Sequence, residues 1–92
     1  MTITVLRTDG SQSAHSFDVD SIDLFKEVRT LISCTWIEVA RLSSGAYLLM
    51  DEDGLLLKKR PNPTASRLYS IGRVTPTTIV GDVALVPKEG MK

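Results

Sequence analysis

The sequence is poor in the side chains on which metal sites and disulfides depend. Among its 92 residues it has one histidine, His15, and one cysteine, Cys34. A single cysteine cannot form an internal disulfide, which is typical of proteins from reducing compartments. The two residues together are also too few to hold structural zinc in a monomer. We therefore expect no metal site and no cofactor.

Glycine-rich loops and long hydrophobic runs are missing as well. The six glycines are scattered singly, so the sequence has no phosphate-binding loop and no dinucleotide fingerprint. The acidic stretch DEDG (51–54) has its glycine too early for a calcium loop, and it predicts a turn instead. No run is long enough to span a bilayer, and no basic and apolar leader follows Met1. These absences predict a cytoplasmic protein without a membrane partner.

Groups for covalent catalysis are equally scarce. His15 is the only histidine, so any nucleophile paired with histidine must use it, with Cys34 or one of the serines as the partner. The alternating segment around His15 predicts a surface strand, whereas the apolar surroundings of Cys34 predict a small core residue. We expect that the protein is not an enzyme.

Net charge is zero, but its distribution along the chain is uneven. Residues 1–53 contain four basic and nine acidic residues, whereas residues 54–81 contain five basic residues and no acidic one. The zero balance argues against a nucleic-acid polymer as partner, because such binding relies on excess positive charge. The acid-free segment indicates an anionic partner of another kind.

Hydrophobic periodicity predicts one α+β domain over residues 1–87 and a frayed tail over 88–92. We expect a small, mostly antiparallel sheet packed by one long helix, plus a second short helix. The long helix is expected at 20–33 with Asp20 or Ser21 as its cap, and the short one at 62–69. A bend is expected at Gly81-Asp82, inside the last strand. The expected strands are 3–7, 14–19, 36–42, 46–50, 55–58 and 77–87.

Two of these strands, AYLLM (46–50) and VALVP (83–87), are apolar on both faces. A small sheet with one helix leaves part of such strands uncovered, so the pattern predicts a homo-oligomer.

The stretch KKRPNPTASRLY (58–69) is the strongest candidate for a binding site. Asn62-Pro63 predicts a helix start, and the free N–H groups and dipole of a helix start attract anions. Arginine adds charge for phosphate, hydroxyls add donors, and an aromatic ring can stack on a base. Two alternatives stay open: the Asn62 side chain caps the helix itself, or the lysines form a solvated rim. The candidate ligand-binding residues are Arg60, Asn62, Thr64, Ser66, Arg67, Tyr69 and Trp36.

Four short motifs in the chain resemble a family of small phage and bacterial proteins grouped as a domain of unknown function. That family shows a YIEVV-L strand, a DEEG-L turn, an N-xAT-L segment and an IVGDVLLV strand, and the resemblance covers roughly residues 20–87. The family often has a glycine pair before the first motif, where this chain has SCT (33–35). The matching positions are Ile37, Glu38, Val39, Leu42, Asp51, Glu52, Gly54, Asn62, Ala65, Leu68, Ile79, Gly81 and Asp82.

The resemblance implies a phage or prophage setting, and so a host bacterial cytoplasm, and no particular reaction. By analogy with phage anti-defence proteins, we expect a homo-oligomeric sponge that sequesters an anionic, cyclic-nucleotide-like immune signal. The alternative is a protein-interaction module that binds and inhibits an acidic host protein. A nucleotide-processing enzyme that uses His15 or the acids of 51–53 is a third reading. Binding of single-stranded nucleic acid is the poorest, because the acidic first half would repel the strand.

Overall fold

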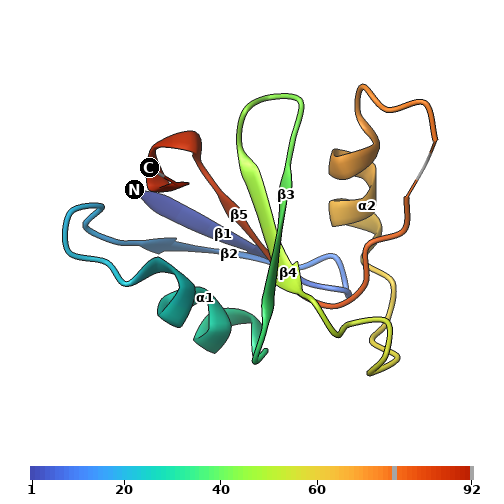
Figure 1. Ribbon diagram of the computed structural model, residues 1–92, viewed down its shortest axis with the longest axis horizontal. Coiled ribbons are helices and arrows are strands. Elements are labelled where there is room, and N and C mark those ends of the chain that lie inside the picture. Colours follow the sequence, from blue (N-terminus) through green and yellow to red (C-terminus); the bar gives the residue numbers. More distant parts are fainter. Residues whose placement is uncertain (76, 92) are drawn as a thin grey trace.

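A computed structural model describes residues 1–75 and 77–91 of the chain. These residues form five strands and two α-helices in the order β-β-α-β-β-α-β, and a short 3₁₀ helix, η1, follows (Figure 1). In chain order the elements are β1 (Thr2–Leu6), β2 (Gln12–Ser16), α1 (Leu24–Ile32), β3 (Ile37–Arg41), β4 (Tyr47–Asp51), α2 (Pro63–Ser70), β5 (Val83–Val86) and η1 (Lys88–Met91). No helix among these residues is long and apolar enough to cross a membrane.

The five strands form one antiparallel sheet in the order β2-β1-β5-β4-β3, which confirms the predicted α+β class. β1–β2 and β3–β4 are hairpins, with registers such as Val5↔Ser13 and Val39↔Leu49. β5 joins the two hairpins by pairing with both β1 and β4. β3 and β2 are therefore the two edge strands.

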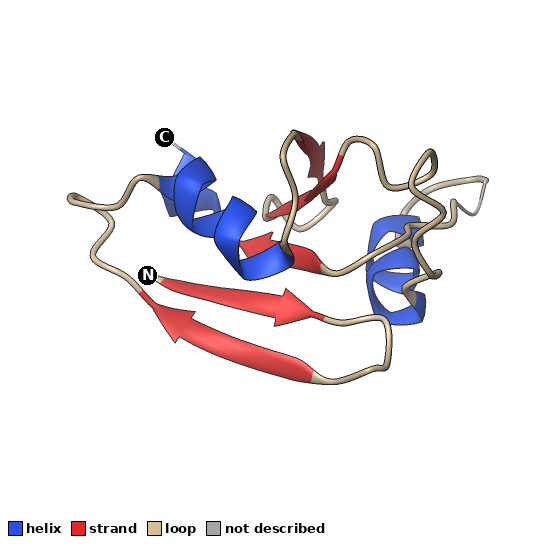
Figure 2. Cartoon of the chain, turned by 90° about the horizontal axis from the view of Figure 1, so that it is seen from below, coloured by secondary structure: helices blue, strands red, loops and turns tan. Residues whose placement is uncertain are grey.

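The sheet carries one helix on each face, which the sequence did not predict. Side chains alternate along a strand, so neighbouring residues of β4 face opposite layers. Leu49 belongs to a core packed by α1, whereas Leu48 belongs to a core that includes Ala65 of α2. Both leucines are fully buried. Figures 1 and 2 show the two helices beside the sheet at separate places. β4 and β5 are thus apolar on both faces because this chain covers both, and that pattern no longer argues for an oligomer.

The first helix is nine residues long, which corrects the prediction of a long helix over 20–33. Its N-cap is Asp23, whose side chain accepts a hydrogen bond from the Lys26 N–H. The preceding residues bond to Asp18 instead: its backbone carbonyl accepts the N–H groups of Ser21 and Ile22. The Asp18 carboxylate also accepts the Asp20 N–H at 3.0 Å, so residues 18–22 form a local turn and the helix begins after it.

The run Leu55–Leu57 is not a strand, which corrects a second prediction. Residues 52–58 form consecutive turns, and Lys58 has a left-handed backbone with φ of 54°. Local hydrogen bonds satisfy this backbone, including Leu57 N–H to the Asp53 carbonyl at 2.9 Å and Lys59 N–H to the Gly54 carbonyl at 3.0 Å. The segment therefore has no need of a strand partner.

The last strand is shorter than predicted, because the chain bends at Gly81, where φ is 78°, as the sequence indicated. The tail also differs from the prediction. Residues 88–91 form η1, and Met91 packs against the α1 core. Lys92, the last residue of the predicted frayed tail, lies outside the described residues.

Candidate functional site

The start of α2 is capped by its own chain, which answers the question left open at Asn62. The Asn62 side chain is fully buried, and its Oδ1 accepts the Ala65 N–H at 3.1 Å. Its Nδ2 donates to the carbonyls of Leu6 and Gly81, both at 2.9 Å. Three hydrogen bonds thus join α2 to β1 and to the bend before β5. The amide is used as a structural cross-link and offers no group to a ligand.

The other hydroxyl and charged candidate residues on α2 do not converge on one site. Ser66 Oγ accepts the Ile79 N–H at 2.7 Å and donates to the Ile79 carbonyl at 3.3 Å, so it holds the segment before β5. The Ser66 N–H bonds to the Asn62 carbonyl, and with the cap at Ala65 this leaves few donors in the first turn. Thr64 is half-buried, and Arg67 is exposed. An anion at this helix end would therefore find few hydrogen-bond donors that are not already used within the protein.

The two aromatic candidates are not placed together. The Arg73 guanidinium lies 4.0 Å from the centre of the Tyr69 ring, so a cation already covers one face of that ring. Arg73 also donates to the carbonyls of Tyr69 and Arg41, each at 2.8 Å. Trp36 is 63% exposed before β3, and its carbonyl accepts the Glu52 N–H at 2.9 Å. No cavity described below is lined by Trp36.

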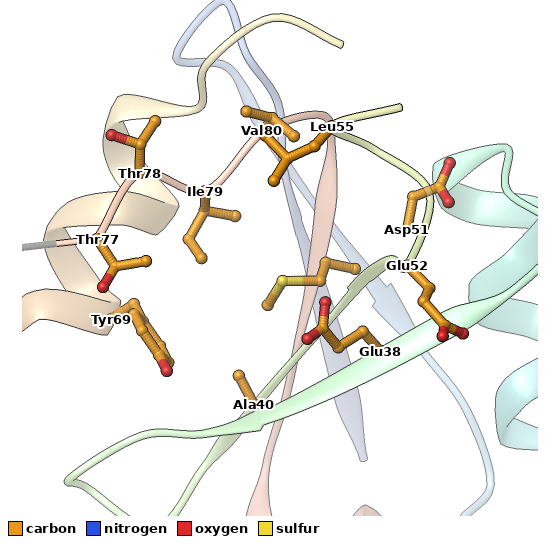
Figure 3. A pocket seen from close by; sticks show the side chains of 11 residues that line it. Glu38, Ala40, Asp51, Glu52, Leu55, Tyr69, Thr77, Thr78, Ile79 and Val80 are labelled. Carbon is orange, nitrogen blue, oxygen red and sulfur yellow. The ribbon is translucent and has the colours of Figure 1, made fainter. Parts of the chain in front are cut away.

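A pocket of about 230 Å³ lies between β3, β4, α2 and the segment 77–80, and we name it the Glu38 pocket (Figure 3). The Glu38 carboxylate points into it, whereas the carboxylates of Asp51 and Glu52 point away (Figure 3). Most of the wall is apolar. The lining residues are Glu38, Ala40, Met50, Asp51, Glu52, Leu55, Tyr69, Thr77, Thr78, Ile79 and Val80.

Beside this pocket the chain exposes three consecutive leucines, and we name residues 55–58 the leucine turn. Leu55, Leu56 and Leu57 are 77%, 82% and 63% exposed, and the exposed Lys58 follows them. Exposed single leucines are ordinary, but three in succession leave a contiguous apolar surface. Leu55 lines the Glu38 pocket, so the turn and the pocket adjoin.

An ion pair fixes the base of the leucine turn. Lys59 Nζ lies 2.7 Å from the Asp51 carboxylate, whose side chain is 3% exposed. Burial raises the pKa of Asp51, but hydrogen bonds from Lys59 and the Asp53 N–H, together with the Lys59 charge, outweigh burial and lower it. Asp51 is therefore ionised at neutral pH. Lys59 is committed to this carboxylate, although the sequence presented it as one of a free basic run.

Arg60 lies at a different, shallower cavity, of about 360 Å³. Its lining residues are Thr8, Ile32, Ser33, Lys59, Arg60, Gly81 and Asp82. Asp82 accepts the Thr8 N–H at 3.0 Å, so a carboxylate shares the cavity with the arginine. Tyr69 and Arg60, the two candidates that line a described cavity, thus line different ones.

The catalytic candidates have little around them. Ser13 Oγ lies 2.8 Å from His15 Nε2, but it also accepts a hydrogen bond from Arg7 at 2.9 Å. Neither Ser13 nor His15 lines the cavities described above. Cys34 packs against the α1 core, and burial followed by the nearby Asp51 charge raises the pKa of its thiol. A protonated thiol is a poor nucleophile.

Among residues 1–75 and 77–91, no group of three or more acidic, histidine or cysteine side chains is placed to hold a metal ion. The chemistry that the described cavities offer is therefore apolar contact with a few charges.

The sequence named Tyr69 but missed the Glu38 pocket and misread the leucine turn as a strand. The three leucines alone are typical of a buried strand, and only the preceding turn residues up to Gly54 indicated that they could lie in an exposed turn. Comparison with known proteins adds nothing to this geometry: no family model, no curated protein and no solved structure matches the chain.

Proposed function

We propose that this chain is a non-enzymatic protein-interaction module, and that the leucine turn docks on an acidic surface of a partner protein. The observation that carries the proposal is the exposure of Leu55, Leu56 and Leu57 at 63–82% in a segment with a fixed backbone. The setting that fits the resemblance is a phage accessory protein in a host bacterial cytoplasm.

Pre-organisation supports this function. The backbone of the turn is held by local hydrogen bonds and by the Lys59–Asp51 ion pair. Gly54 at its start is packed so closely that an added Cβ would lie 2.9 Å from Val80 Cγ2. A contact surface that is ordered before binding loses less conformational entropy on association. Leucines held in this way are suited to be the anchor of an interface.

Charge decides the kind of partner. Lys58 extends the apolar surface with a positive charge, and Arg60 is exposed two residues further on. Residues 54–81 contain no acidic residue, and although Asp82 shares the cavity beside Arg60, Lys58 places a positive charge directly after the leucines. A partner with an apolar patch bordered by carboxylates therefore complements the turn, because interfacial charges set orientation and specificity.

The test uses a defined probe before any natural partner is sought. A synthetic amphipathic helix with leucine on one face and flanking glutamates is titrated by calorimetry against the protein and against Leu56→Ser. A helix with flanking lysines is the matched ligand control, and Val19→Ser, at another exposed apolar position, is the matched protein control. We expect micromolar binding of the acidic helix, lost in Leu56→Ser and kept in Val19→Ser. Equal binding of both helices, or full binding by Leu56→Ser, would contradict the proposal.

A phosphate-bearing small molecule, such as a cyclic-nucleotide signal held by a homo-oligomer, is the second candidate ligand. What favours it is the cavity beside Arg60, whose volume of about 360 Å³ lies within the usual range of small-molecule sites, about 300–1,000 Å³. Calorimetry with cyclic di- and trinucleotides tests it. Binding that is lost in Arg60→Ala and kept in Arg67→Ala would support it, and no heat at millimolar ligand would exclude it.

A further inference from the structure

We propose that the Glu38 pocket is the receptor for the leucine turn of a second copy of this chain, so that two copies exchange their turns. The proposal rests on the leucine turn being a contact surface, as proposed above, and adds the identity of one partner. Both halves of the contact are present in each chain, which makes the surface complementary to itself.

The size and lining of the pocket fit aliphatic side chains. Its volume of about 230 Å³ lies below the range of about 300–1,000 Å³ that is usual for sites of drug-sized ligands. Met50 and Ile79 are buried beneath it, and Ala40 and Val80 contribute further apolar wall. One or two leucine side chains suit such a space better than a nucleotide does.

The negative charge of Glu38 in the pocket favours a positively charged residue next to the inserted leucines. Glu38 is exposed, comes from the edge strand β3, and points its carboxylate into the cavity (Figure 3). None of the described lining residues is basic, so no lining cation neutralises Glu38. The leucine turn of a second copy brings Lys58 directly after Leu57. An apolar segment that ends in a cation is what this pocket complements.

The position of the turn allows the contact to be reciprocal. Leu55 lines the pocket, and Leu56 and Leu57 follow it in the chain, so the inserting group and the receiving group adjoin on one surface. A two-fold axis between two such surfaces places each turn over the other pocket, and the contact then closes as a dimer. A turn and a pocket on distant faces would instead build a ring or an open chain of subunits.

Charge exchange between two variants gives the sharpest test. Glu38→Lys places lysine against lysine in both contacts of its own dimer, and Lys58→Glu places glutamate against glutamate. A mixed pair has one native contact and one reversed contact, both attractive. In sedimentation velocity at 50 mM salt we expect a dimer of the unaltered chain, at least tenfold weaker self-association of each variant, and recovery of the dimer in their equimolar mixture.

Controls separate this contact from other causes. Leu56→Ser is expected to weaken the dimer at least tenfold, and Val19→Ser to leave it unchanged. Circular dichroism and urea unfolding confirm that each variant is folded. A monomer at all concentrations up to 0.5 mM, or variants that do not recover on mixing, would overturn the proposal. So would a dimer that all the variants retain.

The experiments distinguish a failure of this self-contact from a failure of the proposed function. Suppose that Glu38→Lys self-associates as the unaltered chain does, while Leu56→Ser no longer binds the synthetic acidic helix. The exchange of turns between two copies is then wrong, and the proposed interaction module stands. If Leu56→Ser still binds the synthetic acidic helix, but the mixture of the two charge variants recovers the dimer, the leucine turn serves self-association and the docking function is wrong.

Discussion

Replacement of Asn62 by alanine is the most informative perturbation of this fold, because one buried amide joins three segments. Its Nδ2 bonds to carbonyls 56 and 19 positions away, and its Oδ1 caps α2. Loss of a helix cap costs about 1 kcal/mol. Each buried carbonyl left without its donor costs about 1–3 kcal/mol more. We expect Asn62→Ala to lower the free energy of unfolding by roughly 3–7 kcal/mol, a large part of the 5–15 kcal/mol of a typical domain.

Urea unfolding followed by circular dichroism measures this loss, provided that the denaturant slope is unchanged. Two variants sharpen the result. Asn62→Asp keeps a cap acceptor but loses both amide donors, so it should be destabilised at least as much as the alanine variant at neutral pH. Thr64→Ala, on the same helical turn, should change stability by less than about 0.5 kcal/mol. A loss of only about 1 kcal/mol in Asn62→Ala would show that the cap alone matters, and would refute the cross-link.

Three further perturbations test other parts of the structure. The pKa of Asp51 is lowered on folding, so its ion pair stabilises the protein fully above the ordinary carboxyl pKa of 3.8, and this stabilisation is lost as pH falls through the lower folded pKa. Asp51→Asn should therefore reduce the fall in the free energy of unfolding toward acid pH, measured by urea unfolding between pH 2 and 6. A fall as steep as that of the unaltered chain would contradict this. Gly81→Ala should destabilise by about 1–2 kcal/mol, because φ is 78° there and an added Cβ would lie 2.8 Å from Lys59 Cδ; a neutral result in thermal unfolding would refute the strain. Leu49→Ala should cost about 2–5 kcal/mol in the same assay, because Leu49 is fully buried against α1, whereas a small loss would mean that the core collapses around the cavity.

Much of the local structure follows from short stretches of the sequence. Asn62-Pro63 begins a helix because asparagine accepts from the first turn and proline has the backbone angle of a helix start. The expected strands 3–7, 14–19, 36–42 and 46–50 overlap the four strands of the two hairpins, and Gly81 marked the bend that precedes β5. These signals are local, since each depends on groups a few residues apart. They were enough to predict the α+β class and an antiparallel sheet.

The candidate site was less accessible to sequence reasoning, because its residues come together only through packing. Nothing near Asn62 in the sequence shows that its amide will meet Leu6, 56 residues earlier, or that Lys59 will pair with Asp51. Both contacts turn apparent ligand groups into structural ones. The Glu38 pocket likewise combines an edge strand with α2 and the segment 77–80.

The sequence by itself determined the start of α2 at Asn62-Pro63 and the two-faced apolar character of β4 and β5. Only the tertiary structure decided how that character is satisfied, because a strand pattern records that both faces are buried but not by what. α1 and α2 cover the two faces within one chain. β5 occupies the centre of the sheet between the two hairpins, and local hydrogen bonds in the turns already satisfy the backbone of Leu55–Leu57. These leucines are therefore left in solvent, although their sequence alone is that of a buried strand.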